Sequence, residues 1–151
     1  MLKKIGIVVL LLLCCVTFVS AEATEEYADT DVTAHLGEYT ITPAKDSGGD
    51  YGLRYVSDTI TQGETNWHTK NVDSSITVLH VDLNWGDQTD SLRLKVYSPD
   101  WQYLGTYFDD ADRTIDGRIN IDIKNPDGIA TGTWHYEVYG YEVEETEDYY
   151  I

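Results

Sequence analysis

Hydrophobic and polar residues alternate with a period of two along the second half of the chain. The alternating segments are 92–97, 119–124 and 134–139, and each places its apolar side chains on one face of an extended strand. Glycine, proline and aspartate punctuate the chain roughly every ten residues, which is the spacing of turns in all-β domains. No stretch shows the apolar stripe of a helix. The pattern predicts an all-β fold, a jelly-roll-like antiparallel β-sandwich of seven to eight strands.

Within residues 76–85, the alternation of apolar and polar residues shifts by one position. Ile76 and Val78 share one parity, whereas the apolar residues from Leu79 to Trp85 share the other. Either a β-bulge near Val78 or burial of both faces of the strand would explain this change.

The first residues resemble a secretory signal. Lys3 and Lys4 precede an apolar run over 5–19, and small residues follow it. This run is shorter than the roughly twenty residues that a transmembrane helix needs. We expect a cleaved signal peptide at 1–21, cut after Ala21 or, as second choice, after Ala23. An uncleaved membrane anchor is the alternative, and the expected location is secreted, or extracellular.

The charge balance restricts the partners. The chain has 27 acidic and 10 basic residues, and two of the basic residues lie in the expected signal peptide. Such a surface repels nucleic acid and anionic membranes and favours cations or basic partners, although a saline habitat would select it equally. Both cysteines, Cys14 and Cys15, lie in the apolar run, so the mature domain would have no disulfide.

The remaining chain divides by composition. We expect an acidic, weakly patterned lead or linker at 22–50, a β-sandwich domain at 51–143 and a fraying acidic tail at 144–151. Within the lead, only 38–42 has strand character.

Three segments carry a resemblance to a known family, in the same order and at similar spacing. These are 61–67 (TQGETNW), 92–100 (LRLKVYSPD) and 132–140 (GTWHYEVYG). Together they resemble the opening strand, the central strand with its turn, and the closing strand of bacterial and archaeal pre-peptidase C-terminal (PPC) domains. The chain is similar to a free-standing secreted version of such a PPC-like domain.

The resemblance implies a jelly-roll-like sandwich without catalytic residues of its own, and some relatives use calcium or bind extracellular matrix. The chain departs from the family at Trp101, where the turn usually has glycine. Because a bulky residue tolerates positive φ poorly, we expect a different turn there, with Trp101 exposed.

The residues themselves offer no catalytic motif. His35, His68, His80 and His135 lack metalloprotease spacing, and there is no nucleophile elbow and no phosphate loop. His80 and His135 fall on the polar parity of their strands. We therefore expect no enzyme.

An acidic run is the candidate metal site. Its carboxylates are Asp109, Asp110, Asp112 and Asp116. Clustered carboxylates on an irregular loop suit calcium, which takes six to eight oxygen ligands, although the run does not match an EF-hand. An exposed acidic loop without an ion is the alternative, and Asp87 and Asp90 would join the site if the fold brings them close.

The aromatic residues divide into two groups. Trp67, Trp85 and Trp134 are expected in the core. The tyrosines of opposite parity, together with Trp101, would form an exposed face: Tyr97, Tyr103, Tyr107, Tyr139 and Tyr141. Aromatic platforms stack on sugars or on partner side chains. We take Trp101, Tyr103 and Tyr107 as candidate ligand-binding residues.

Two classes of function follow. The first is a secreted, non-catalytic accessory or binding domain, stabilised by calcium, that contacts an extracellular polymer or protein. The alternative is a structural subunit of an extracellular filament or surface layer. In that case the lead, or strand 38–42, would self-assemble by adding to a neighbour's sheet.

Overall fold

A computed structural model describes residues 34–36, 39–44 and 55–151. These residues form ten strands and one short 3-10 helix: β1 (Ala34–Leu36), β2 (Tyr39–Pro43), β3 (Ser57–Thr61), β4 (Thr65–Val72), β5 (Val78–Asn84), β6 (Ser91–Tyr97), β7 (Tyr103–Tyr107), η1 (Asp109–Asp112), β8 (Arg118–Lys124), β9 (Gly132–Glu142) and β10 (Thr146–Tyr150). The expected signal peptide at 1–21 and most of the expected lead lie outside the described residues. Within the described part of the chain, no helix is long and apolar enough to cross a bilayer.

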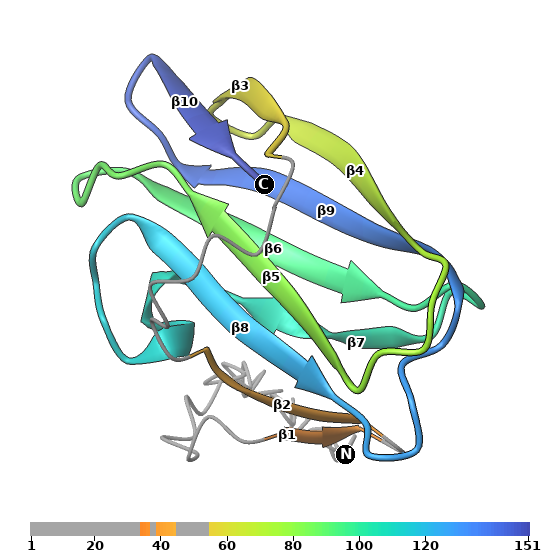
Figure 1. The fold of residues 1–151 in the computed structure, drawn as a ribbon. Coiled ribbons are helices and arrows are strands. Elements are labelled where there is room, and N and C mark those ends of the chain that lie inside the picture. Colours follow the sequence, from red (N-terminus) through yellow and green to blue (C-terminus); the bar gives the residue numbers. More distant parts are fainter. Residues whose placement is uncertain (1–33, 37–38, 45–54) are drawn as a thin grey trace, which may run out of the picture.

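The strands form two antiparallel sheets, which confirms the all-β sandwich. One sheet has six strands in the order β1-β2-β8-β5-β10-β3, and the other has four in the order β4-β9-β6-β7. Figure 1 shows β2 between β1 and β8, and β3 beside β10. The structure has ten strands rather than the predicted seven to eight. The additional strands, β1, β2 and β10, lie outside the predicted domain of 51–143.

Strands on both sides of the predicted domain belong to the sandwich, so the predicted domain bounds of 51–143 are too narrow. In β2, Tyr39 and Ile41 are buried, and the strand pairs with β8 from Thr40↔Lys124 to Pro43↔Ile121. At the other end, β10 pairs with β3 and buries Tyr149 completely. The expected fraying tail at 144–151 is wrong, because Tyr149 stabilises it by burying a large aromatic ring.

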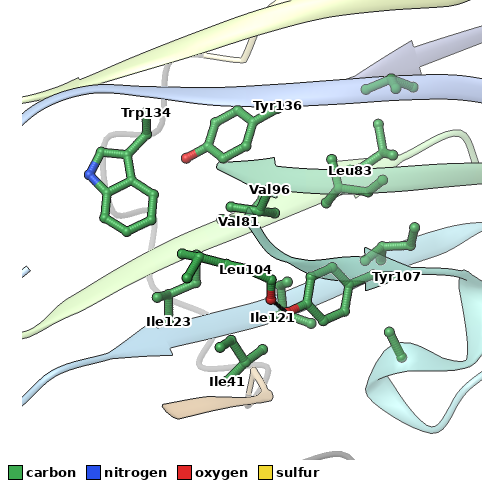
Figure 2. Packing of buried hydrophobic residues seen from close by; sticks show 14 of the residues in the cluster. Ile41, Val81, Leu83, Val96, Leu104, Tyr107, Ile121, Ile123, Trp134 and Tyr136 are labelled. Carbon is green, nitrogen blue, oxygen red and sulfur yellow. Dashed lines mark hydrogen bonds between the residues drawn. The ribbon is translucent and has the colours of Figure 1, made fainter. Parts of the chain in front are cut away.

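The core lies between the two sheets. The predicted alternation holds in β6, β8 and β9, where the buried residues are Leu92, Leu94, Val96, Ile119, Ile121, Ile123, Trp134, Tyr136 and Val138. Figure 2 shows five of them, together with Ile41, Val81, Leu83 and Leu104 from the neighbouring strands: Val96, Ile121, Ile123, Trp134 and Tyr136. Each fully buried aliphatic side chain contributes about 1.5–3 kcal/mol relative to exposure.

The phase change near Val78 marks the start of β5. The pairing of β5 with β8 runs without a shift from Val78↔Lys124 to Asn84↔Arg118, so there is no bulge. Val78 is exposed and Ile76 precedes the strand. Burial of both faces does occur further along, because Asp82 on the outer parity is buried and its carboxylate accepts two bonds from Arg118, at 2.7 and 3.0 Å.

Candidate functional site

Five aromatic side chains gather on the outer side of the four-stranded sheet, and we call this group the aromatic face. Its members are Trp67 of β4, Tyr97 of β6, Trp101 of the β6–β7 turn, Tyr103 of β7 and His135 of β9. Ring centroids lie 5.8 Å apart for Trp67–Tyr97, 6.0 Å for Trp67–Trp101 and 5.6 Å for Tyr97–Tyr103. Trp101 stacks on His135 at 3.9 Å. The exposed fractions of Trp67, Trp101 and Tyr103 are 51%, 57% and 50%.

Strand register assembles this face. Tyr97 pairs with His135 on one side and with Tyr103 on the other, so three rings from three strands form one row across the sheet. Trp67 stands opposite Glu137 in the adjacent row. All of these residues have the parity opposite to the buried side chains of their strands or lie near a strand end.

Trp101 is presented by a tight turn with a left-handed backbone. Its φ is 64°, its N–H donates to the Ser98 carbonyl at 2.9 Å, and the Ser98 N–H donates to the Gln102 carbonyl at 3.0 Å. This is a three-residue hairpin loop in which a type I turn ends on a left-handed residue, the position that glycine favours. The expectation of a different turn was therefore wrong. The turn has the left-handed backbone that favours glycine, and this conformation costs about 1–2 kcal/mol at Trp101.

Beside the rings lies a small ionic network centred on Glu137. Its carboxylate accepts from Lys95 Nζ at 2.8 Å and from Arg93 at 3.3 Å. The Arg93 guanidinium also lies over the ring of Tyr139, 4.3 Å from its centroid. Partial burial, and then the negative charge of Glu137, raise the pKa of Tyr97 above its ordinary value. The network supplies hydrogen-bonding groups in the rows next to the rings.

The predicted ligand-binding residues separate in the structure. Trp101 and Tyr103 lie on the aromatic face, whereas Tyr107 is only 9% exposed and belongs to the core. The Tyr107 hydroxyl donates to the Leu104 carbonyl at 2.7 Å, the bond drawn in Figure 2. Gly105 makes this possible, since its φ is 131° and a Cβ there would lie 2.7 Å from the Tyr107 hydroxyl.

The tryptophan predictions also divide. Trp85 and Trp134 are buried, as expected, but Trp67 is exposed. Val72, the one buried residue of β4, has the parity opposite to Trp67, so the two side chains lie on different faces of the strand. Of the other two tyrosines predicted to be exposed, Tyr141 lies at the surface against Phe108, with 5.1 Å between centroids, and Tyr139 is half-buried under Arg93.

The acidic loop, residues 109–117, is organised by its first carboxylate. Asp109 is buried, and one of its oxygens accepts the backbone N–H groups of Asp116, Gly117 and Arg118 at 3.2, 3.1 and 3.0 Å. Asp110 is exposed. Burial, together with the charges of Asp116 and Asp109, raises the pKa of Asp112. Asp109 therefore closes the loop by hydrogen bonds within the chain.

The other two candidate ligands have partners of their own. Asp87 accepts from the Thr89 N–H and hydroxyl at 2.8 and 2.7 Å, and Asp90 accepts from the Glu144 N–H at 3.1 Å. Across the described ranges, no group of three or more histidine, cysteine, aspartate or glutamate side chains is arranged to hold a metal ion. Calcium binding stays a hypothesis.

A separate pocket of about 70 Å³ opens where the six-stranded sheet is incomplete. Strands β5 and β10 share only the pair Tyr150↔Asn84, and the pocket is lined by side chains of both sheets, including His68, His80 and Tyr136. His68 Nε2 lies 2.6 Å from the Tyr149 hydroxyl, and burial lowers the pKa of His68. The Tyr136 hydroxyl is buried and has no protein hydrogen-bond partner among the described residues. Sequence patterning gave no signal for this pocket, because it arises from the splaying of two strands.

Comparison with known proteins finds an archaeal protein with a similar sequence. No protein-family model matches the chain, so the resemblance to PPC domains stays a prediction. An uncharacterized protein of Archaeoglobus fulgidus is 43% identical over 51 residues, which are 34% of this chain and 71% of that protein. The chain belongs to the same family as this archaeal protein.

Proposed function

We propose that the chain is an exported, non-catalytic binding module that holds an extracellular polymer on its aromatic face. One observation carries the proposal: Trp67, Trp101 and Tyr103 come from three separate elements, converge on one side of the sandwich and are each at least half exposed. Large exposed aromatic groups of this kind mark contact surfaces, because a soluble domain gains stability by burying such rings.

The backbone at Trp101 supports the same conclusion. Glycine would occupy this turn position without strain, yet the chain has a tryptophan with φ of 64° there. Residues held in unfavourable backbone conformations concentrate at functional sites. The lack of catalytic sequence motifs supports a binding role over an enzymatic one.

Binding to immobilised polymers tests the proposal. We would measure retention of the full chain on a panel of polysaccharides and on gelatin, and compare it with the double variant Trp67→Thr, Trp101→Gly. We expect the wild type to bind at least one polymer and the double variant to lose that binding. Equal binding by both proteins would show that the aromatic face does not bind the polymer.

Export is the second part of the proposal, and it rests on the sequence of residues 1–23. We expect the exported protein to begin at Glu22, as measured by intact mass after expression with the leader in place. An uncleaved chain in the membrane fraction would favour the anchor instead.

Calcium stabilisation is a further part of the proposal, supported by the carboxylates of the acidic loop. The competing proposal, a filament or surface-layer subunit that assembles by strand addition, has weaker support. Strand 38–42 overlaps β2, which is already paired on both sides, with β1 and with β8. Size-exclusion chromatography would show concentration-dependent assembly if the filament proposal holds.

A further inference from the structure

The aromatic face has a geometry that restricts what it can bind. The indole and phenol rings do not share a plane: Trp67 is tilted by 35° from Tyr97 and by 63° from Trp101, and Tyr97 is tilted by 48° from Tyr103. A flat, rigid surface could therefore rest on only one of these rings at a time. A ligand that turns along its length could stack on several in succession.

The ring spacing suits a chain of small ring units. Neighbouring centroids along Trp67, Tyr97 and Tyr103 lie 5.8 and 5.6 Å apart. This is comparable to the length of one sugar ring in an extended glycan. Each aromatic ring could stack on the C–H face of a different sugar.

Hydrogen-bonding groups lie in the row next to the rings. Trp67, Glu137, Lys95 and Thr106 stand opposite one another across the four strands, one row away from His135 and Tyr97. The Tyr103 hydroxyl lies 2.5 Å from the Thr106 hydroxyl. A sugar combines an apolar ring face with hydroxyl groups around its edge, and this alternation of rings and polar groups matches it.

Charge decides between neutral and anionic polymers. The chain carries a net charge of −17, so its overall field repels a polyanion. The two cations of this face, Arg93 and Lys95, are both already paired with Glu137. Together with Glu137 they leave one net positive charge, which is too little to hold a row of sulfates or carboxylates against the overall field.

A protein partner fits the face less well. Protein interfaces of standard size bury about 800 Å² on each side around a core depleted of charged residues. Here an ion-paired carboxylate, Glu137, stands directly opposite Trp67. Closing a protein surface over this network would desolvate the charges, whereas sugar hydroxyls would replace water as hydrogen-bond partners.

We propose that the aromatic face binds a neutral glycan as a single soluble chain that twists along its length, rather than a crystalline glycan, a polyanion or a protein. This inference rests on the proposed function and names the ligand class for the same face.

Affinity electrophoresis of the full chain tests the inference. The native gels contain xylan or mixed-linkage β-glucan as neutral soluble glycans, or alginate as an anionic one. Microcrystalline cellulose and gelatin beads, used in pull-downs, represent a flat crystalline glycan and a protein. We expect retarded migration with at least one neutral soluble glycan, and neither retardation by alginate nor retention on cellulose or gelatin.

Three variants assign the binding to the face. Trp101→Gly removes the ring at a backbone position that glycine favours, and Trp67→Thr removes the other exposed indole. We expect each to weaken binding by about two- to tenfold, because each removes one stacking ring. The control is Tyr150→Thr, which removes a tyrosine with 52% exposure from β10 of the other sheet and should leave binding unchanged.

The outcomes separate the two proposals. If the wild type binds none of the probes, the proposed function falls and the inference falls with it. If it binds only alginate, cellulose or gelatin and the tryptophan variants weaken that binding, the proposed function stands and the inference is overturned. Binding of a neutral glycan that the tryptophan variants do not weaken would overturn both, provided that circular dichroism shows the variants folded.

Discussion

The indole of Trp101 lies flat on the imidazole of His135, with 3.9 Å between the ring centroids and 16° between the ring planes. Trp101 comes from the turn after β6, and His135 comes from the inner strand β9. The contact holds the indole against the sheet although the backbone of Trp101 is in the left-handed region, with φ of 64°. Stacking and backbone strain therefore oppose each other at one residue.

This opposition predicts different results for two substitutions of Trp101. In Trp101→Gly, relief of about 1–2 kcal/mol of backbone strain offsets the loss of a stack worth about 0.5–1.5 kcal/mol, so the free energy of unfolding should change by less than about 1 kcal/mol. Trp101→Ala loses the stack and keeps the strain, so it should destabilise by about 1 kcal/mol. Urea denaturation measures both. Equal destabilisation by the two variants would mean that φ at residue 101 carries no strain.

Two buried tyrosines allow a matched measurement of how much a hydroxyl hydrogen bond contributes to the free energy of unfolding. Tyr107 donates to the Leu104 carbonyl, whereas the Tyr136 hydroxyl has no protein partner in the described part of the chain. Tyr107→Phe should lower the free energy of unfolding by about 1 kcal/mol, because a buried carbonyl loses its donor. Tyr136→Phe should change it by no more than about 0.5 kcal/mol, because no protein hydrogen bond is lost. A larger loss in Tyr136→Phe than in Tyr107→Phe would contradict this comparison.

The pairing of Glu147 with Asp90 predicts an unusual pH dependence. Burial, followed by the hydrogen bond and charge of Asp90, raises the pKa of Glu147 to about 7. The folded state therefore holds this proton more tightly than the unfolded state does. The resulting contribution to stability is complete below the unfolded pKa, near 4.5, and is lost as the pH rises through about 7.

We expect Glu147→Gln to remove this dependence and to be more stable than the wild type above pH 7, by about 1 kcal/mol because the side chain is partly exposed. Thermal unfolding from pH 4 to pH 8 measures the difference between the two proteins. Glu142→Gln, at an exposed position near the end of β9, controls for the loss of one negative charge. A constant difference between Glu147→Gln and the wild type over this range would rule out the raised pKa.

The acidic loop has a structural role that does not depend on an ion. Asp109→Ala leaves three backbone N–H groups without their acceptor, so we expect a loss of about 2–3 kcal/mol in calcium and in chelator alike. Asp110→Ala, at an exposed position, should have little effect. A loss for Asp109→Ala that appears only in calcium would show that the carboxylate acts as an ion ligand instead.

The calcium hypothesis makes a separate prediction. An ion that binds only the folded state stabilises it by about 2.7 kcal/mol at a hundredfold excess over its Kd. Under this hypothesis, calcium raises the melting temperature of the wild type relative to chelator, and Asp112→Ala abolishes the rise. If calcium causes no shift in the wild type, these aspartates form an ordinary hydrated loop.

Some features of the candidate site could be predicted from the sequence, and others could not. The exposure of Trp101 follows from its place in a proline–aspartate turn. The opposite parity of Trp67 and Val72 places them on different faces of β4, but the sequence does not say which face is covered. Tyr107 was out of reach, because Gly105, with φ of 131°, interrupts the alternation of β7 and turns Tyr107 inward while Tyr103 stays outside.

The sequence by itself determined the class of fold and the inner faces of β6, β8 and β9, because side chains alternate strictly across a strand and those strands are regular. Only the tertiary structure decided that β2 and β10 complete the six-stranded sheet, and that rings from β4, β6, β7 and β9 meet on one surface. The physical reason is that local alternation defines two faces of a strand. Which face is covered, and which residues of distant segments become neighbours, depends on strand order and register across the sheets.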